Sequence, residues 1–181
     1  MTLYTGDVSQ SGGEYVFMWK KAVNYADKKN HNVINCLILG VGGGTVVEIV
    51  KSKYPACQIT GVEIDPQMIK AAEEYFGLKK FKNFKLVNAD AYRWVSKNKL
   101  KFDLIITDLF INGLNPDFSW TKEFLTIVRK LLKHNGLMLF NSHYLNEDSG
   151  EFEKFKSKCR KIFTEVTEIH QFSKNRILLL A

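Results

Sequence analysis

A glycine-rich turn follows the first apolar run of the chain, and its composition is typical of a ligand-binding loop. The apolar run 37–39 leads into a stretch with four glycines among five residues, and a helix-compatible segment follows. Glycine lets the backbone approach a ligand closely, and the first N–H groups of the following helix lack partners within that helix. A P-loop is excluded because no Gly-Lys-Ser/Thr triplet follows. The residues expected to contact a ligand here are Gly40, Val41, Gly42, Gly43, Gly44 and Thr45.

Two acidic residues follow the next two apolar runs. Glu63 ends the segment 58–63, about 20 residues after the turn, where a carboxylate can bind a ribose diol. Asp90 follows the run 85–88, and its alternative role is to cap a helix that begins at Ala91. With the glycine turn, these acids predict a site for a nucleoside-bearing cofactor. Nicotinamide binding is the alternative, although Thr45 stands where the GxGxxG pattern requires its third glycine.

A third acid, Asp108, directly follows the mainly apolar run 103–107. A carboxylate at this edge can orient an amine, take a proton or contact the cofactor, and the alternative is a capping or loop acid. Asp103 precedes the apolar residues of the run and is expected to face solvent. His143 and Tyr144 follow the next run at the same edge. Either could act in acid-base chemistry, but ordinary surface side chains are the favoured interpretation.

The elements that would position these residues alternate between short apolar runs and amphipathic stretches, a pattern typical of a parallel sheet with helices on both faces. The expected strands are 35–39, 58–63, 85–88, 103–107 and 137–142. The expected helices are 14–29, 45–53, 66–76, 91–97, 120–133 and 147–162. His134-Asn135-Gly136 is the expected stop signal of the fifth of these helices.

The C-terminal segment departs from this alternation. The β-prone runs 165–172 and 176–180 are separated by only three residues, too few for a helical crossover, so they must pair as an antiparallel hairpin. The sequence therefore predicts an α/β, doubly wound, seven-stranded and mostly parallel sheet closed by a C-terminal antiparallel hairpin, the fold of class I methyltransferases. We expect residues 1–30 to form a lead and a helix that packs on the domain, and residues 31–181 to form the Rossmann-like domain.

Composition excludes several classes of protein. The chain has 181 residues, 45% of them hydrophobic and 25% charged, which is ordinary for one globular domain. No run of 18 apolar residues, no signal-peptide pattern and no CxxC spacing among the three cysteines is present, so we expect a cytoplasmic protein that does not associate with membranes. The segment Lys79–Lys101 holds eight basic residues against one acid, which accounts for the net charge of +7. A solvated lysine-rich face is the favoured interpretation, and a nucleic-acid surface is the alternative.

Several of these motifs together resemble a known family. The chain from about Gly6 onward resembles the catalytic domain of spermidine synthases, and more closely their methyltransferase-like relatives within the class I S-adenosylmethionine-dependent fold. The matching segments are 40–44, 61–66, 75–77, 88–91, 102–108, 123–125 and 135–137, with weaker matches at 6–10 and 15–18.

The resemblance implies a role for each matching position. Glu63 would bind the ribose hydroxyls, and Asp90 would bind the adenine amino group. Asp108 would be the catalytic aspartate, with Gln10 and Tyr15 near the reacting end of the cofactor. Ile64 and Ala91, which adjoin the two cofactor acids, are expected to contact the cofactor as well. The oligomeric state stays open, and a homodimer is one alternative because spermidine synthases as a group often dimerise.

Two departures from the family pattern bear on the reaction. Thr45 stands where aminopropyl-transferring members usually carry an acid, and Ile111 replaces the second acid of their Asp-Ser-Ser-Asp motif. Without these acids, the positive charges of decarboxylated S-adenosylmethionine and of a polyamine would be poorly balanced. S-adenosylmethionine itself has a carboxylate that suits a helix N-terminus. We therefore expect an S-adenosylmethionine-dependent methyltransferase with an unknown acceptor. The alternatives are an aminopropyltransferase that uses decarboxylated S-adenosylmethionine, and a non-catalytic nucleoside-binding domain.

Overall fold

The computed structural model describes residues 4–5, 8–9, 13–143, 150–172 and 175–181. Gln10, which the resemblance implies lies near the cofactor, and Tyr144 both lie outside the described residues. The described strands at the start of the chain, β1 (Tyr4–Thr5) and β2 (Val8–Ser9), pair antiparallel with each other.

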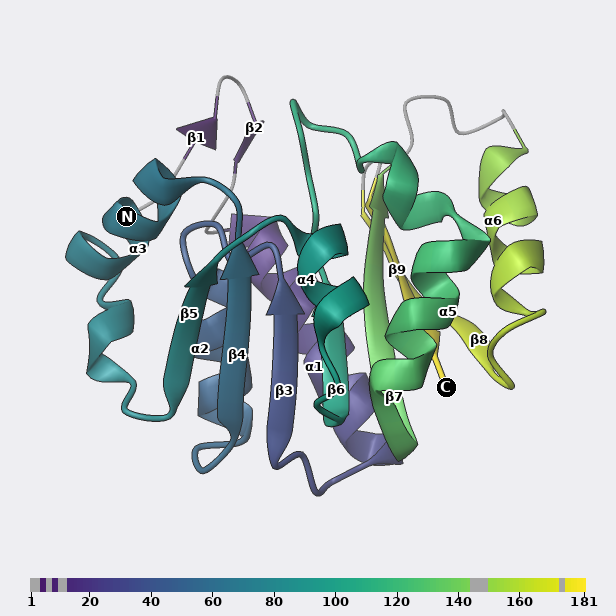
Figure 1. The fold of residues 1–181 in the computed structure, drawn as a ribbon, viewed down its shortest axis with the longest axis horizontal. Coiled ribbons are helices and arrows are strands. Elements are labelled where there is room, and N and C mark those ends of the chain that lie inside the picture. The colour runs from purple at the N-terminus through teal and green to yellow at the C-terminus, as the bar shows by residue number, and fades with distance from the viewer. Residues whose placement is uncertain (1–3, 6–7, 10–12, 144–149, 173–174) are drawn as a thin grey trace.

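A seven-stranded sheet forms the centre of the molecule, in the order β5-β4-β3-β6-β7-β9-β8 (Figure 1). Its strands are β3 (Asn35–Leu39), β4 (Gln58–Glu63), β5 (Phe84–Asn88), β6 (Phe102–Thr107), β7 (Leu132–His143), β8 (Val166–Phe172) and β9 (Asn175–Leu180). Strands β3 to β7 are parallel, whereas β9 pairs antiparallel with both β7 and β8. The predicted fold class is therefore confirmed, including the closing hairpin.

Helices cover both faces of the sheet (Figure 1). The α-helices are α1 (Gly13–Lys29), α2 (Thr45–Lys53), α3 (Pro66–Glu74), α4 (Ala91–Lys97), α5 (Lys122–Leu131) and α6 (Glu151–Cys159), with 3-10 helices η1 (Leu78–Lys80) and η2 (Asp117–Trp120). Successive residues of β6 point to opposite faces, so Leu104 and Ile106 pack with α1 and α2, while Ile105 packs with α4, α5 and α6. The sheet is consequently buried on both faces by two separate apolar cores.

The boundary between α5 and β7 differs from the prediction. The expected helix 120–133 is instead η2 followed by α5, which ends at Leu131, and residues 134–136 extend β7 rather than stop a helix. Leu132 already has an extended backbone, with ψ of 142°. The pairing of β7 with β6 shifts register between Phe102 and Leu104, which accommodates the early start of the strand. The expected helices 66–76 and 147–162 are also shorter, and the latter is described only from residue 150 onward.

Asp103 is buried, which corrects the expectation that it faces solvent. Its side chain lies at the N-terminal edge of the sheet, and the residue is 8% exposed. One carboxylate oxygen accepts hydrogen bonds from the backbone N–H groups of Ile34 (3.1 Å) and Asn35 (2.8 Å) and pairs with Lys133 Nζ at 2.8 Å. The start of β3 needs a partner for these two N–H groups, so the acid is retained inside the structure.

Part of the positive charge of the segment Lys79–Lys101 is paired locally. Lys79 contacts Glu73 at 3.3 Å and Lys80 contacts Glu48 at 2.8 Å, and both acids lie outside the segment. Across the described chain, we find no helix with the length and apolar character needed to cross a membrane.

Gly40 lies where the carboxyl ends of β3, β4 and β6 meet. Its φ of +85° lies in the left-handed region, and a Cβ atom placed on it would lie 2.2 Å from the carbonyl oxygen of Asp108. The strands meet here because the Gly40 N–H donates to the Val62 carbonyl oxygen (2.9 Å) and the Asp108 N–H donates to that of Leu39 (2.8 Å). No side chain fits between these backbones.

We therefore expect Gly40→Ala to lower the free energy of unfolding by about 3 kcal/mol or more, since it combines left-handed strain with a backbone clash. Gly77→Ala is the matched control: Gly77 also has a positive φ (+65°), but its Cβ position is 3.8 Å from its nearest neighbour. This control should lose only about 1 kcal/mol. Urea unfolding of both variants measures the difference, and equal losses would show that the approach to Asp108 is unimportant.

Candidate functional site

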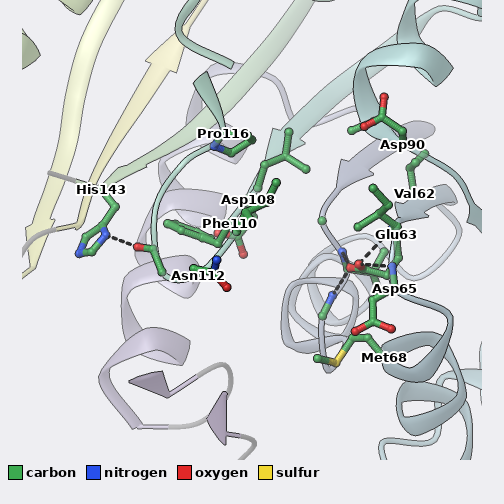
Figure 2. Close-up of a pocket in the computed structure, with 18 of the residues that line it drawn as sticks. Val62, Glu63, Asp65, Met68, Asp90, Asp108, Phe110, Asn112, Pro116 and His143 are labelled. Carbon is green, nitrogen blue, oxygen red and sulfur yellow. Dashed lines mark hydrogen bonds between the residues drawn. The ribbon is translucent and has the colours of Figure 1, made fainter. Parts of the chain in front are cut away.

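A cavity of about 620 Å³ lies at the carboxyl ends of β3, β4, β5 and β6 (Figure 2). Of the residues predicted to contact a ligand, those that line it are Tyr15, Gly40, Val41, Gly42, Thr45, Glu63, Ile64, Asp90, Ala91 and Asp108. Gly43 and Gly44 are not among its lining residues. The topology explains this gathering, because parallel strands deliver their C-terminal residues to one edge of the sheet.

Two glycines of the turn have different reasons to be glycine. A Cβ on Gly42 would meet none of the described atoms within 4 Å, and Gly42 lines the cavity with a φ of +51°. Here the missing side chain leaves open space for a close approach by a ligand. A Cβ on Gly44 would lie 2.5 Å from a Leu78 methyl group, with φ at +86°. Gly44 is therefore required by its packing against η1 and its backbone conformation.

Glu63 holds the glycine turn against the end of β4. One carboxylate oxygen accepts hydrogen bonds from the backbone N–H groups of Val41 and Gly42, both at 3.0 Å. The other accepts from Ile64 (2.9 Å) and Asp65 (3.1 Å). These four amides fix the direction of the carboxylate and occupy about four lone-pair sites, the full acceptor capacity of the group. A ribose diol would therefore share the oriented oxygens with these amides.

Two further acids on the same side of the cavity cap helices. Asp90 accepts a hydrogen bond from the Arg93 N–H (2.8 Å) at the start of α4, so the capping alternative is observed, and Asp90 lines the cavity as well. Asp65 accepts from the Gln67 N–H (2.8 Å) at the start of α3 and also lines the cavity. Sequence reasoning did not include Asp65, although Pro66 directly after it marks a helix start.

Asp108 is a buried carboxylate with two side-chain donors. Tyr15 Oη donates to one of its oxygens, and Asn141 Nδ2 donates to the other at 2.9 Å. Burial raises the pKa of Asp108 to about 6, while the hydrogen bonds from Tyr15 and Asn141 and the nearby Trp19 oppose that rise. Burial and the neighbouring carboxylate also raise the pKa of Tyr15 well above its usual value, so Tyr15 stays a donor. Asp108 is therefore poised to exchange a proton near neutral pH.

The side-chain amide of Asn115 connects the segment that follows Asp108 to β7. Asn115 Nδ2 donates to the carbonyl oxygens of Leu109 (2.9 Å) and Asn141 (3.0 Å), and Asn115 Oδ1 accepts from the His143 N–H at 2.6 Å. Asn115 is 7% exposed and Asn141 is fully buried. Sequence reasoning missed both residues, because an isolated Asn in a loop or a strand carries no local signal of a long-range bond.

The segment after Asp108 forms a tight turn at the mouth of the cavity. Ile111 and Leu114 exchange two backbone hydrogen bonds of 2.8 and 3.1 Å, and the residues between them, Asn112 and Gly113, have φ values of +52° and +80°. The dipeptide Asn-Gly is a known signal for such a turn. His143 lines the cavity, and its Nδ1 lies 2.5 Å from the Gly113 carbonyl oxygen.

The cavity is acidic although the chain is basic. Its described lining includes four carboxylates, Glu63, Asp65, Asp90 and Asp108, and no Lys or Arg. The net charge of the whole chain is +7. Negative charge on the cavity wall repels free anions and attracts cations, so this lining favours a nucleoside that carries positive charge.

Comparisons with known proteins find a matching family and similar enzymes. Residues 18–173 match the family model described as the spermine/spermidine synthase domain. A polyamine aminopropyltransferase of Vibrio vulnificus is 31% identical over 148 residues, which cover 79% of this chain and 48% of that protein. An eEF1A lysine and N-terminal methyltransferase homolog of Drosophila pseudoobscura pseudoobscura is 30% identical over 114 residues, covering 58% of this chain and 17% of that protein.

Solved structures share the fold. Human methyltransferase-like protein 13, in a complex with SAH, superposes with a TM-score of 0.75 at 21% identity, covering 92% of this chain and 80% of that structure. The chain spans about half the length, or less, of the curated relatives it matches. The similar proteins are transferases of two kinds, aminopropyltransferases and methyltransferases.

The raised pKa of Asp108 predicts a specific pH dependence of stability. The folded pKa is about 6 against the ordinary value of 3.8, so the native state binds more protons between these two values and stability falls as the pH rises through them. Once the pH is well above the folded pKa, the full cost of about 3 kcal/mol is present. Asp108→Asn removes this cost, so it should be more stable relative to the wild type at pH 7 than at pH 4.

Urea unfolding of both proteins across this pH range measures the effect. Asp117→Asn, at an exposed acid, is the control and should track the wild type. If the curves of Asp108→Asn and the wild type run parallel, Asp108 is not destabilised by burial.

Proposed function

Since the chain belongs to the spermine/spermidine synthase family, we propose that it is an S-adenosylmethionine-dependent methyltransferase of the spermidine synthase-like group. The proposal rests on the uncharged start of α2, directly after the glycine turn. Thr45, which is uncharged, lines the cavity at the first residue of α2, and Gly44 provides no side-chain cap for that helix. The free N–H groups and the hydroxyl there suit the carboxylate of S-adenosylmethionine.

The rest of the cavity fits the nucleoside half of this cofactor. Glu63 offers an oriented carboxylate for the ribose hydroxyls, and Asp90 offers an acceptor for the adenine amino group. Ile64 and Met68 supply apolar lining in the same cavity. Ile64 is 57% exposed, so its side chain has surface left for an adenine ring to cover.

Asp108 is the candidate base at the reacting end. The bound cofactor would supply a methyl group from a positively charged sulfur, which would keep the electron pair of the broken bond. If the acceptor is an amine, its nitrogen would have to lose a proton as it takes the methyl group. Asp108, held by Tyr15 and Asn141, is placed to receive that proton. Methyl transfer needs little more than this and in-line positioning.

Aminopropyl transfer is the second candidate, favoured by the similarity to polyamine aminopropyltransferases. It uses the decarboxylated cofactor, which presents an ammonium group without a carboxylate. That group would lie near Thr45, which carries no charge to balance it. A non-catalytic nucleoside-binding domain is the third candidate, and it would bind cofactor without turnover.

Calorimetry with the two cofactors separates the first two candidates. We expect S-adenosylmethionine to bind about tenfold more tightly than its decarboxylated form, because only the former has a carboxylate for the start of α2. Thr45→Asp is the diagnostic variant: it should abolish or reverse the preference by repelling the carboxylate and attracting the ammonium. An acid in the first helical turn is compatible with the fold. A wild-type preference for the decarboxylated form would favour aminopropyl transfer, and binding of neither would refute both reactions.

The role of Glu63 generates a further expectation. Glu63→Ala should weaken binding of S-adenosylmethionine by roughly 2–3 kcal/mol, since hydrogen bonds to a charged acceptor are lost together with the anchor of the glycine turn. Glu48→Ala, which removes an exposed carboxylate on α2 that pairs with Lys80, is the control and should bind normally. Melting temperatures of both variants check the fold. Normal affinity in a folded Glu63→Ala protein would remove Glu63 from the binding site.

A further inference from the structure

The wall of the cavity beyond Asp108 carries no described charged side chain other than His143, whose ring bonds the Gly113 carbonyl oxygen, and much of it is apolar. Leu109, Phe110 and Ile111 follow the acid directly and line the cavity together with Pro116 and Phe118, and the uncharged Asn112 and Asn175 line it as well. Figure 2 shows Phe110 and Pro116 beside Asp108, across the cavity from Glu63 and Asp90. Ile111 is 55% exposed, so it retains apolar surface that a bound molecule could cover.

Hydrogen bonds fix the position of this wall. The two backbone bonds between Ile111 and Leu114 close the turn, and the His143 ring holds the Gly113 carbonyl oxygen. At the base of the segment, Asn115 binds the carbonyl oxygens of Leu109 and Asn141. The apolar residues are thus presented by a braced turn that is tied to β7.

Among the described lining residues, Asp108 is the one carboxylate at this end of the cavity. The other three acids of the described lining, Glu63, Asp65 and Asp90, lie on the opposite side, as Figure 2 shows. Each of them already accepts backbone N–H groups. One ammonium can therefore be balanced by Asp108, whereas a second ammonium further along would face the hydrocarbon of Phe110 and Ile111 and the uncharged side chain of Asn112, with no described carboxylate to pair with. Such a charge would lose solvation without gaining a partner, which is costly.

We infer that the acceptor is a molecule with a single amine on an apolar body, and that Ile111 is a residue that determines this specificity. The amine lies at Asp108 and the apolar body covers Phe110 and Ile111. The inference rests on the proposed function for the identity of the donor cofactor. The selection between one and two charges comes from the wall itself.

A pair of matched amines tests this inference. Pentylamine and putrescine have the same number of non-hydrogen atoms, and they differ in whether the far end is a methyl or an ammonium group. Each is titrated into the full chain saturated with S-adenosylhomocysteine, and binding is followed by calorimetry or ligand-observed NMR. Pentylamine should bind about tenfold more tightly, because its far methyl gains burial where the second ammonium of putrescine loses solvation.

Ile111→Asp should reverse the order, since it places a carboxylate where the second ammonium would lie. Leu100→Asp, at an apolar residue that is 61% exposed and not among the cavity's lining residues, is the matched control and should keep the wild-type order. The inference is overturned by a wild-type preference for putrescine, by equal binding, by binding of neither amine, or by an unchanged order in Ile111→Asp.

The same titrations without S-adenosylhomocysteine separate this inference from the proposed function. If the nucleoside fails to bind but pentylamine is still preferred, the proposed donor cofactor is wrong and the acceptor specificity stands. If the nucleoside binds and the amine preference is absent, only the acceptor specificity fails.

Discussion

The contact between Gly40 and the Asp108 carbonyl oxygen is the constraint on which the site depends. It sets β3 and β6 side by side at their carboxyl ends, at a separation that leaves no room for a Cβ atom. The glycine turn therefore begins beside the buried acid, and Glu63 then fastens the turn to β4. A cofactor held by the turn is consequently placed next to Asp108 by backbone geometry alone. Neither loop length nor side-chain flexibility needs to bring the two together.

Burial and hydrogen bonding have opposite effects on the pKa of Asp108. Burial disfavours the carboxylate, while Tyr15 and Asn141 donate hydrogen bonds that favour it. The balance is an acid whose pKa, about 6, lies closer to neutral pH than that of an exposed aspartate. Such an arrangement destabilises the folded protein at neutral pH, and it is retained most readily where a group must exchange protons. The burial of Asp108 therefore lowers stability at neutral pH and, at the same time, raises its pKa toward the range useful for proton transfer.

The sequence predicted the parts of the fold that depend on local pattern. Strands β3 and β4 and helices α2 and α4 have the predicted bounds, because apolar periodicity and capping residues such as Asp90 mark them directly. The prediction that Asp103 faces solvent was wrong because its partners, the N–H groups of Ile34 and Asn35, are about 70 positions away in the sequence. Asn141 and Asn115 were missed for the same reason. A pattern of residue types shows which face a side chain occupies, but not the distant donor it will meet.

The two reactions named among the relatives can share one fold because the nucleoside half and the reacting half of the cavity are built by different strands. Glu63 ends β4, Asp65 and Asp90 follow β4 and β5, and Asp108 and the turn 111–114 follow β6. Under the proposed function, changes at Thr45 or Ile111 would alter which charges are tolerated without disturbing Glu63 or the contact at Gly40. The choice of donor and acceptor would then be separable from the framework, because function depends on the residues of the site and not on the fold alone.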